Sequence, residues 1–261
     1  MLTTNPFAEL SAFISPSVMQ TYIVVMIILV AAGTIYDVLH KKSARYFREN
    51  MRKAKASATQ KVGSGEMLSM AIKTAVVDVA ASGEFCNPQR RIAHLLTMYG
   101  FVAFAVTTAI MVFQYPTPTT PTPAILPLLW HIGALLVCVG GYWFWFFIRV
   151  DVAAEGSSPF RVMRADLFIL SLLASATFAL VWSYLQVAGN AWANVFFGLH
   201  VIGTTLLFGS VPWSKFAHMF FKPAAAFEKR VSAANGSRSN LPAPADKPES
   251  FGSPVEQPRH Y

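Results

Sequence analysis

The chain has 261 residues, of which 54% are hydrophobic and only 13% are charged, and its formal net charge is +8. Soluble domains carry about 25% charged residues, and the few charges here are bunched, since none occurs between Arg91 and Arg149 or between Asp166 and Lys215. These long uncharged stretches exclude an ordinary soluble enzyme, a disordered protein and a disulfide-stapled secreted domain, and they predict an all-α integral membrane protein.

Five segments are long and apolar enough to cross a bilayer, whose core needs about 20 helical residues. An external N-terminal segment, residues 1–17, precedes the first of them. The proline-rich run Pro116–Pro123 cannot continue a helix and separates the second span from the third. A short turn at Val187–Ala191 separates the last two. The predicted spans cover residues 18–38, 92–113, 124–148, 167–186 and 192–213.

The remaining segments differ in character. Met67–Ser82 has apolar residues at helical spacing, which predicts an amphipathic helix on the membrane surface or against a partner. After the five-helix membrane domain, residues 18–222, the tail becomes rich in Ser, Pro, Ala and Gly. Residues 223–261 are therefore expected to form a disordered cytoplasmic tail.

The basic residues predict the orientation. All 21 Lys and Arg lie in three segments, from His40 to Arg91, from Arg149 to Arg164, and from Lys215 onward. The positive-inside rule then places the N-terminus outside and the C-terminus in the cytoplasm. Lys41–Lys61 alone has eight basic residues and one acid. That excess predicts attraction to anionic membrane lipid or to an acidic surface on a soluble partner. The positive net charge of the whole chain is explained by its orientation in the bilayer, so it does not indicate binding to nucleic acid.

Four of the six histidines are candidate haem ligands. His131 and His200 lie inside apolar spans, each about seven residues from the outer end, and an ionisable residue at membrane depth is a functional candidate. His94 and His218 share a depth near the cytoplasmic ends. On the fifth predicted helix, His200 and His218 are 18 residues apart, which is five helical turns, so we expect them to project from the same face. Two level pairs are what two stacked b-type haems require, since haem iron takes imidazole ligands.

The same histidines are also compatible with a purely structural role. A histidine in a membrane helix can serve as a hydrogen-bonding group between helices, whereas no carboxylate or thiol lies at either depth to complete a zinc site. Several glycines beside the histidines allow close approach of a flat cofactor or of two helices. They are Gly133, Gly140, Gly141, Gly198, Gly203 and Gly209.

Two segments resemble a known family. Leu199–Phe221 has a histidine early, an apolar stretch closed by Pro212-Trp213-Ser214-Lys215, and then a second histidine. This pattern resembles the last helix of the respiratory nitrate reductase gamma-subunit family. Cys86–Phe104 is similar to the second helix of related tricarballylate-oxidising cytochrome b subunits and of the membrane domain of quinone-interacting membrane-bound oxidoreductases.

The resemblance implies a five-helix cytochrome b subunit in a bacterial inner membrane. Such a subunit passes electrons between the quinone pool and cytoplasmic iron–sulfur or flavin oxidoreductase subunits, and is itself non-catalytic or quinone-reacting. The chain also looks like the membrane anchor of dissimilatory adenylylsulfate reductase, which implies a role in sulfur metabolism. The family carries a second ligand ten residues after His94, where this chain has Phe104. His131 is the residue expected to replace it.

Two alternatives compete with the cytochrome. One is a haem-free anchor that docks a soluble oxidoreductase on the membrane. The other is a transporter, which is weakened by the lack of mid-membrane carboxylates and of an inverted repeat. For the cytochrome, we expect quinone to react at the outer end, because a cytoplasmic partner would occupy the other end of a two-haem path.

Overall fold

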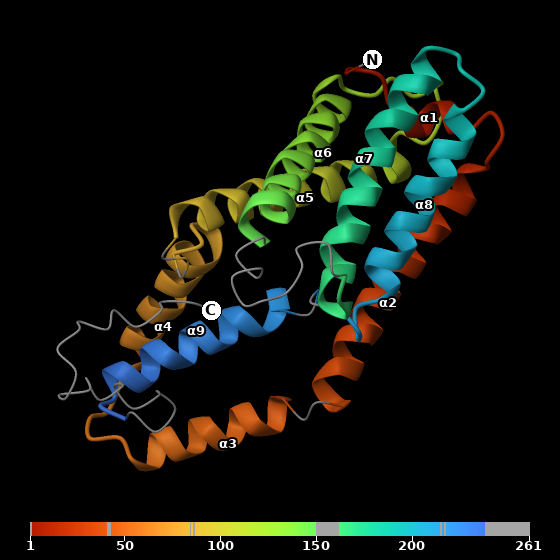
Figure 1. Ribbon diagram of the computed structural model, residues 1–261. Helices are drawn as coiled ribbons and strands as arrows, with labels where there is room; N and C mark the ends of the chain where they lie inside the picture. Colours follow the sequence, from red (N-terminus) through yellow and green to blue (C-terminus); the bar gives the residue numbers. More distant parts are fainter. Residues whose placement is uncertain are drawn as a thin grey trace. The chain divides into compact units, whose positions relative to one another are not determined.

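The computed structural model describes residues 2–40, 43–83, 85, 87–149, 162–214, 216 and 218–237, and the regular elements in these ranges are all helical. The chain divides into two units (Figure 1). Unit 1 comprises Met1–Tyr36 and Ile92–Phe216, and unit 2 comprises Asp37–Arg91 and Ala217–Tyr261. The loop 150–161 and the tail residues 238–261 lie outside the described residues.

Unit 1 holds the long apolar helices. They are α2 (Pro16–His40), α5 (Pro88–Gln114), α6 (Ile125–Trp143) with its π-helical extension η2 (Phe144–Ile148), α7 (Leu167–Val187) and α8 (Ala193–Gly209). A short helix, α1 (Pro6–Leu10), precedes α2, and the 3-10 turn η4 (Arg164–Asp166) leads into α7. The bounds of α2 and α5 continue into unit 2. Each predicted span therefore contains a helix.

Four of these helices have the length and apolar character of a membrane span: Pro16–His40, Pro88–Gln114, Ile125–Ile148 and Leu167–Val187. Helix α8 is equally apolar but has only 17 residues. At 1.5 Å rise per residue it is about 26 Å long, slightly less than the roughly 30 Å hydrocarbon core. The length and apolar character of these helices therefore indicate a multi-pass membrane protein. A fifth crossing and the orientation of the termini stay predictions.

The expected continuous helix from residue 192 through His218 is not present. Helix α8 ends at Gly209, and the next helix, α9, begins at His218. Between them the chain turns, with Trp213 and Ser214 donating their N–H groups to the carbonyl of Ser210. Pro212 favours this break because the residue before a proline avoids helical backbone angles. The prediction that His200 and His218 share one helix face is therefore wrong, because they lie on two different helices.

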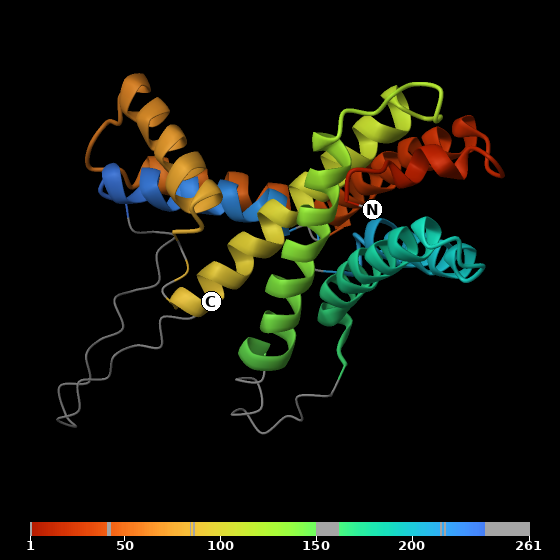
Figure 2. The ribbon, with the colours of Figure 1, turned by 90° about the horizontal axis from the view of Figure 1, so that it is seen from above.

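Glycines let the helices of unit 1 approach closely. A Cβ added to Gly133 would lie 2.7 Å from the Phe104 nitrogen, and one added to Gly100 would lie 2.7 Å from the Gly133 oxygen, so α5 and α6 meet backbone to backbone. A Cβ added to Gly203 of α8 would likewise lie 2.9 Å from the Ser175 nitrogen of α7. Helices α7 and α8 run side by side in both views (Figures 1 and 2). These glycines serve helix packing.

The N-terminal segment is part of the core of unit 1. Asn5 caps α1 by accepting the N–H groups of Phe7 and Ala8, and its Nδ2 donates to the Tyr115 carbonyl at 2.9 Å. Phe7 and Leu10 are buried, and the Phe7 ring contacts Trp130 and Trp182 edge-on. The apolar face of α1 packs against α6 and α7, so this part of the expected external segment, residues 1–17, is held against the helix bundle, and its external position stays a prediction.

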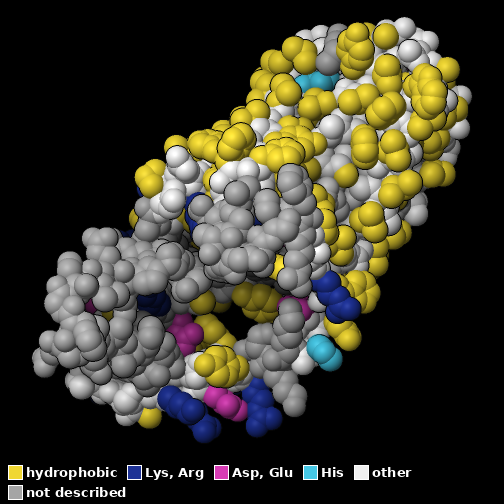
Figure 3. Space-filling view, viewed as in Figure 1, with side chains coloured by type: hydrophobic (Ala, Val, Ile, Leu, Met, Phe, Trp, Pro, Cys, Tyr) yellow, Lys and Arg dark blue, Asp and Glu magenta, His cyan; other side chains and the backbone are white. Residues whose placement is uncertain are grey.

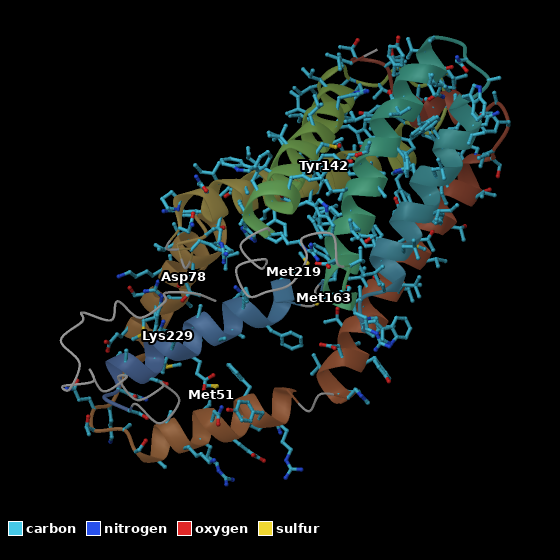
Figure 4. The ribbon with its side chains drawn as sticks, viewed as in Figure 1. Met51, Asp78, Tyr142, Met163, Met219 and Lys229 are labelled. Atoms are coloured by element: carbon cyan, nitrogen blue, oxygen red, sulfur yellow. The ribbon has the colours of Figure 1, made fainter. Side chains whose placement is uncertain are left out.

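Unit 2 is built from α3 (Ser43–Ala56), α4 (Ser64–Lys73), the π-helical segment η1 (Thr74–Ala80) and α9 (His218–Ala234). The Arg230 guanidinium of α9 donates two hydrogen bonds of 2.8 Å to the Asp78 carboxylate of η1; Asp78 is labelled in Figure 4. The helix α9 thus occupies residues 223–234, which the sequence assigned to a disordered tail. An ion pair and the buried Ala226 hold that part of the chain in place.

Large apolar side chains are exposed along the helices of unit 1. Ile27, Ile35, Val139, Ile202 and Leu206 each expose half or more of their surface, and Figure 3 shows hydrophobic side chains covering the visible face of these helices. Exposed apolar area on this scale marks a surface that meets lipid or a partner. For helices of this length and hydropathy, lipid is the fitting neighbour.

Candidate functional site

His131 is fully buried in the second turn of α6. Its Nδ1 lies 2.7 Å from the Pro127 carbonyl oxygen, one turn earlier. A carbonyl oxygen only accepts, so Nδ1 carries the proton and Nε2 is the unprotonated nitrogen of a neutral ring. The Ser183 hydroxyl of α7, 2.8 Å away, donates to Nε2.

His200 occupies the matching position in α8 and is 7% exposed. Its Nδ1 lies 2.9 Å from the Ser175 carbonyl oxygen of α7, so it too is a donor and Nε2 again has the lone pair. The Ser175 hydroxyl lies 3.3 Å from the same nitrogen and 2.7 Å from the Thr204 hydroxyl. Among the described residues, nothing hydrogen-bonds to Nε2 of His200.

An aromatic cluster joins the two histidines. The Trp130 ring meets His131 edge-on at 4.8 Å between centroids, and the Trp182 ring stacks on His200 at 5.9 Å. The two tryptophans contact each other at 6.1 Å, and Phe104 packs against both Trp130 and His200. The structure therefore brings His131 and His200 to one buried cluster near the ends of α6 and α8 that carry no Lys or Arg.

The second predicted pair is not brought together by what the structure describes. His94 is half-buried on α5 in unit 1. His218 is the first residue of α9 in unit 2, and its side chain lies outside the described residues. A haem between these two histidines stays a prediction from the sequence.

The donor chemistry of the buried pair fits haem. An axial histidine offers a neutral imidazole nitrogen while its other ring N–H is held by a carbonyl, which fixes the tautomer and the ring orientation. Both His131 and His200 have that arrangement. The Nε2 of His200 could bind iron directly. The Nε2 of His131 would first have to lose its hydrogen bond from the Ser183 hydroxyl. Trp130 and Trp182 fill the space around the pair, so binding of a macrocycle would require these rings to turn.

A cavity of about 270 Å³ lies beside this cluster and was not expected from the sequence. Six residues from the N-terminal segment and the last turns of α7 line it: Thr4, Pro6, Glu9, Ser183, Gln186 and Val187. The Gln186 Nε2 donates to the Pro6 carbonyl at 3.1 Å, and its Oε1 is buried with no hydrogen-bond partner among the residues that the structure describes. This cavity forms because α1 is buried. The sequence did not predict it, because the five residues of α1 are too few to give a periodic signal.

A buried ion pair closes the opposite end of α6 and α7. The Arg149 Nε donates to the Asp166 carboxylate at 3.0 Å, a second bond runs from its Nη2, and the Met163 N–H also donates to that carboxylate. The guanidinium lies 4.1 Å above the Trp145 ring. Both ends of the loop 150–161, which lies outside the described residues, are thereby tied together.

One comparison with characterised proteins gives a match. The chain is 25% identical over 174 residues to citrate utilization protein B of Escherichia coli, an alignment that covers 61% of this chain and 44% of the relative. The chain thus spans less than half the length of that protein. No family model and no solved structure matches the chain.

Proposed function

We propose that this chain is a membrane cytochrome b subunit that passes electrons between the quinone pool and a cytoplasmic oxidoreductase. The observation that supports it most is the shared geometry of His131 and His200. Each ring is buried in an apolar helix bundle, and each Nδ1 is held by a backbone carbonyl so that Nε2 has the lone pair. Neutral imidazoles of that kind at membrane depth suit haem iron.

Under this proposal His131 and His200 hold one haem, and His94 and His218 hold a second. Haem supplies a centre that accepts and releases one electron at a time. The protein groups orient the ligands: the Pro127 and Ser175 carbonyls fix the two ring tautomers. The surrounding tryptophans exclude water from the ligand nitrogens, and exclusion of water is one means by which a protein sets a haem potential.

The partner and the location belong to the same proposal. The cytoplasmic partner would be an iron–sulfur or flavin subunit, adenylylsulfate reductase among the candidates, and the membrane would be the bacterial inner membrane. Helix α3 offers a docking surface, because Arg45, Arg48, Arg52 and Lys53 lie on it exposed, while Phe47 and Ala54 on the opposite side are turned inward. A surface of this charge attracts an acidic partner at long range.

The test is spectroscopic. Protein purified in mild detergent from haem-replete cells should show reduced-minus-oxidised bands of b-type haem. His200→Ala should lose one haem per chain, because an axial ligand is gone, and His131→Ala should lose the same one. His260→Ala, in the C-terminal tail, is the matched control and should keep the full haem content.

The competing function gives different spectra. A colourless preparation that still binds a soluble oxidoreductase would favour the haem-free anchor. Full haem content in His200→Ala would contradict the assignment of this ligand. If His131→Ala lost a haem other than the one lost in His200→Ala, the pairing through the aromatic cluster would be wrong.

A further inference from the structure

The helix formed by α4 and η1 in unit 2 buries little of its surface. Every residue of α4 is at least partly exposed, and in η1 Thr74 is buried. Three large apolar side chains along this helix, Leu68, Ile72 and Val76, expose 63%, 57% and 57% of their surface. They are four residues apart, which is close to one helical turn, so they line one side of the helix. We call these three residues the apolar stripe.

The other sides of this helix already have suitable neighbours. The Asp78 carboxylate accepts two hydrogen bonds of 2.8 Å from Arg230, so the side that carries Asp78 faces α9. Glu66, Ser69 and Lys73 are exposed and spaced by three or four residues, so they form a polar side that suits water. The apolar stripe lies on neither of these sides and is left to meet what surrounds the protein.

The end of η1 is tied to the start of a membrane span. The Gly83 N–H donates to the Val77 carbonyl at 2.7 Å, and the Arg91 Nε donates to the Ala81 carbonyl at 2.8 Å. Arg91 lies in the first turn of α5. The long uncharged part of α5 begins at the next residue, Ile92. These bonds, all within unit 2, hold the end of η1 beside the point where α5 becomes a membrane helix.

We infer that the apolar stripe lies on the lipid surface at the side of the membrane where α5 begins. Exposed apolar area of this kind marks a surface that meets lipid or a protein, and the connection to α5 favours lipid. Helices that lie in the membrane surface combine an apolar face with a polar one. With 10 residues in α4 and 7 in η1, the helix is too short and too polar to span. This lipid contact is independent of the proposed haem.

The stripe differs from the exposed surface of α3. Helix α3 presents Arg48, Arg52 and Lys55, and attraction through such charges is screened by salt. The stripe is apolar, and the Asp78 charge on the same helix is neutralised by Arg230. Contact through the stripe should therefore persist at high salt and on lipid without net charge. The lipid surface would then be met by α4 and η1, which leaves α3 to a soluble partner.

Nitroxide labels on single cysteines measure what surrounds each position. The full-length protein with Cys86→Ala and Cys138→Ala is reconstituted in phosphatidylcholine vesicles, which have no net charge, and is labelled at Ile72→Cys or Val76→Cys. At both positions, collisions with oxygen, which dissolves in lipid, should exceed collisions with a water-soluble nickel chelate several-fold, at low and at high salt. Lys73→Cys is the matched control, because it follows Ile72 directly but lies on the polar side, and it should give the reverse order.

Three results would overturn the inference. More frequent collisions with the nickel chelate at Ile72→Cys and Val76→Cys would place the stripe in water. Few collisions with either reagent would show that protein covers it, either another segment of this chain or a second copy. Loss of the oxygen preference at high salt would assign the contact to charge and not to the stripe.

A second measurement uses the chain without any substitution. An aryl diazirine dissolved in the lipid of the same vesicles is activated by light, and the modified residues are located by mass spectrometry. Residues 68–76 should be modified, whereas α3 should not. The double variant Ile72→Gln with Val76→Gln should lower modification of this segment several-fold. No modification of residues 68–76 in the unsubstituted chain would contradict the lipid contact, as would unchanged modification in the double variant.

Discussion

Arg149 and Asp166 show how a charged pair is tolerated at the margin of an apolar bundle. Their side chains are 8% and 11% exposed, and the carboxylate also accepts the Met163 N–H. Removing charges from water is unfavourable, so such a pair contributes little net stability compared with two apolar residues of similar size. Removing one partner alone destabilises the protein, because the charge that remains is then buried without a counter-charge.

This asymmetry gives a prediction for the pair. Arg149→Met should lower the free energy of unfolding by about 3 kcal/mol, because Asp166 is left without its counter-charge. The double variant Arg149→Met with Asp166→Leu should recover most of that loss. Reversible unfolding in mixed detergent micelles measures both. A double variant as unstable as the single one would show that the pair itself, and not the orphaned charge, determines the stability.

The two buried histidines differ from that pair because the Nδ1 of each donates to a backbone carbonyl. The Pro127 carbonyl is available because it lies one turn before His131, whereas the partner of His200 is on another helix. The sequence predicted both histidines as site residues from their depth alone. It could not predict the contacts with Ser175 and Ser183, since these depend on how α7 is rotated against α6 and α8.

At the level of helices, the elements that the sequence predicts well are those with long apolar runs. Each predicted span agrees with a helix to within four residues at either end. The break near Pro212 was missed because the spacing of His200 and His218 was read as if the helix were continuous. Helix α1 was missed because Phe7 and Leu10 give no periodic signal in so short a segment. Helix α3 was missed because its apolar face is small.

Glycine substitutions test the packing of α5 on α6. A Cβ on Gly133 would lie 2.7–2.8 Å from backbone atoms of α5, which cannot move as a side-chain end can. Gly133→Ala should therefore destabilise the protein by about 2 kcal/mol. Gly198→Ala is the control, since nothing lies within 4 Å of a Cβ there. It should be neutral or stabilising by up to about 1 kcal/mol, because alanine favours helix. Thermal unfolding in detergent distinguishes the two, and equal effects would contradict backbone contact between α5 and α6.

At the scale of the whole molecule, charge is the feature that the sequence reports most directly. The described part of unit 2 carries exposed basic residues on α3, where Arg45 pairs with Glu49 at 2.8 Å. The hydrogen bond from Arg45 holds the pKa of the Glu49 carboxyl below its ordinary value, so the one acid of this helix stays ionised. Because positive charge is retained on the cytoplasmic side during insertion, the same residues that would attract a partner also predict which way the chain lies.

The predicted orientation of the chain also implies that α8 crosses the membrane. With the N-terminus outside, five crossings put the C-terminus in the cytoplasm, whereas four put it outside. The seven basic residues from Lys215 onward argue for the cytoplasm, and a 17-residue apolar helix is at the short limit of what spans.

Reporter fusions resolve this question. Green fluorescent protein, which matures only in the cytoplasm, should fluoresce when fused after residue 58 or after Tyr261. Alkaline phosphatase, which is active only outside, should be active when fused after residue 119 or after Gly189. The fusions after residues 58 and 119 are controls for the spans α2 and α5, whose length is not in question. A dark fluorescent fusion at Tyr261 together with an active phosphatase there would show that α8 does not cross.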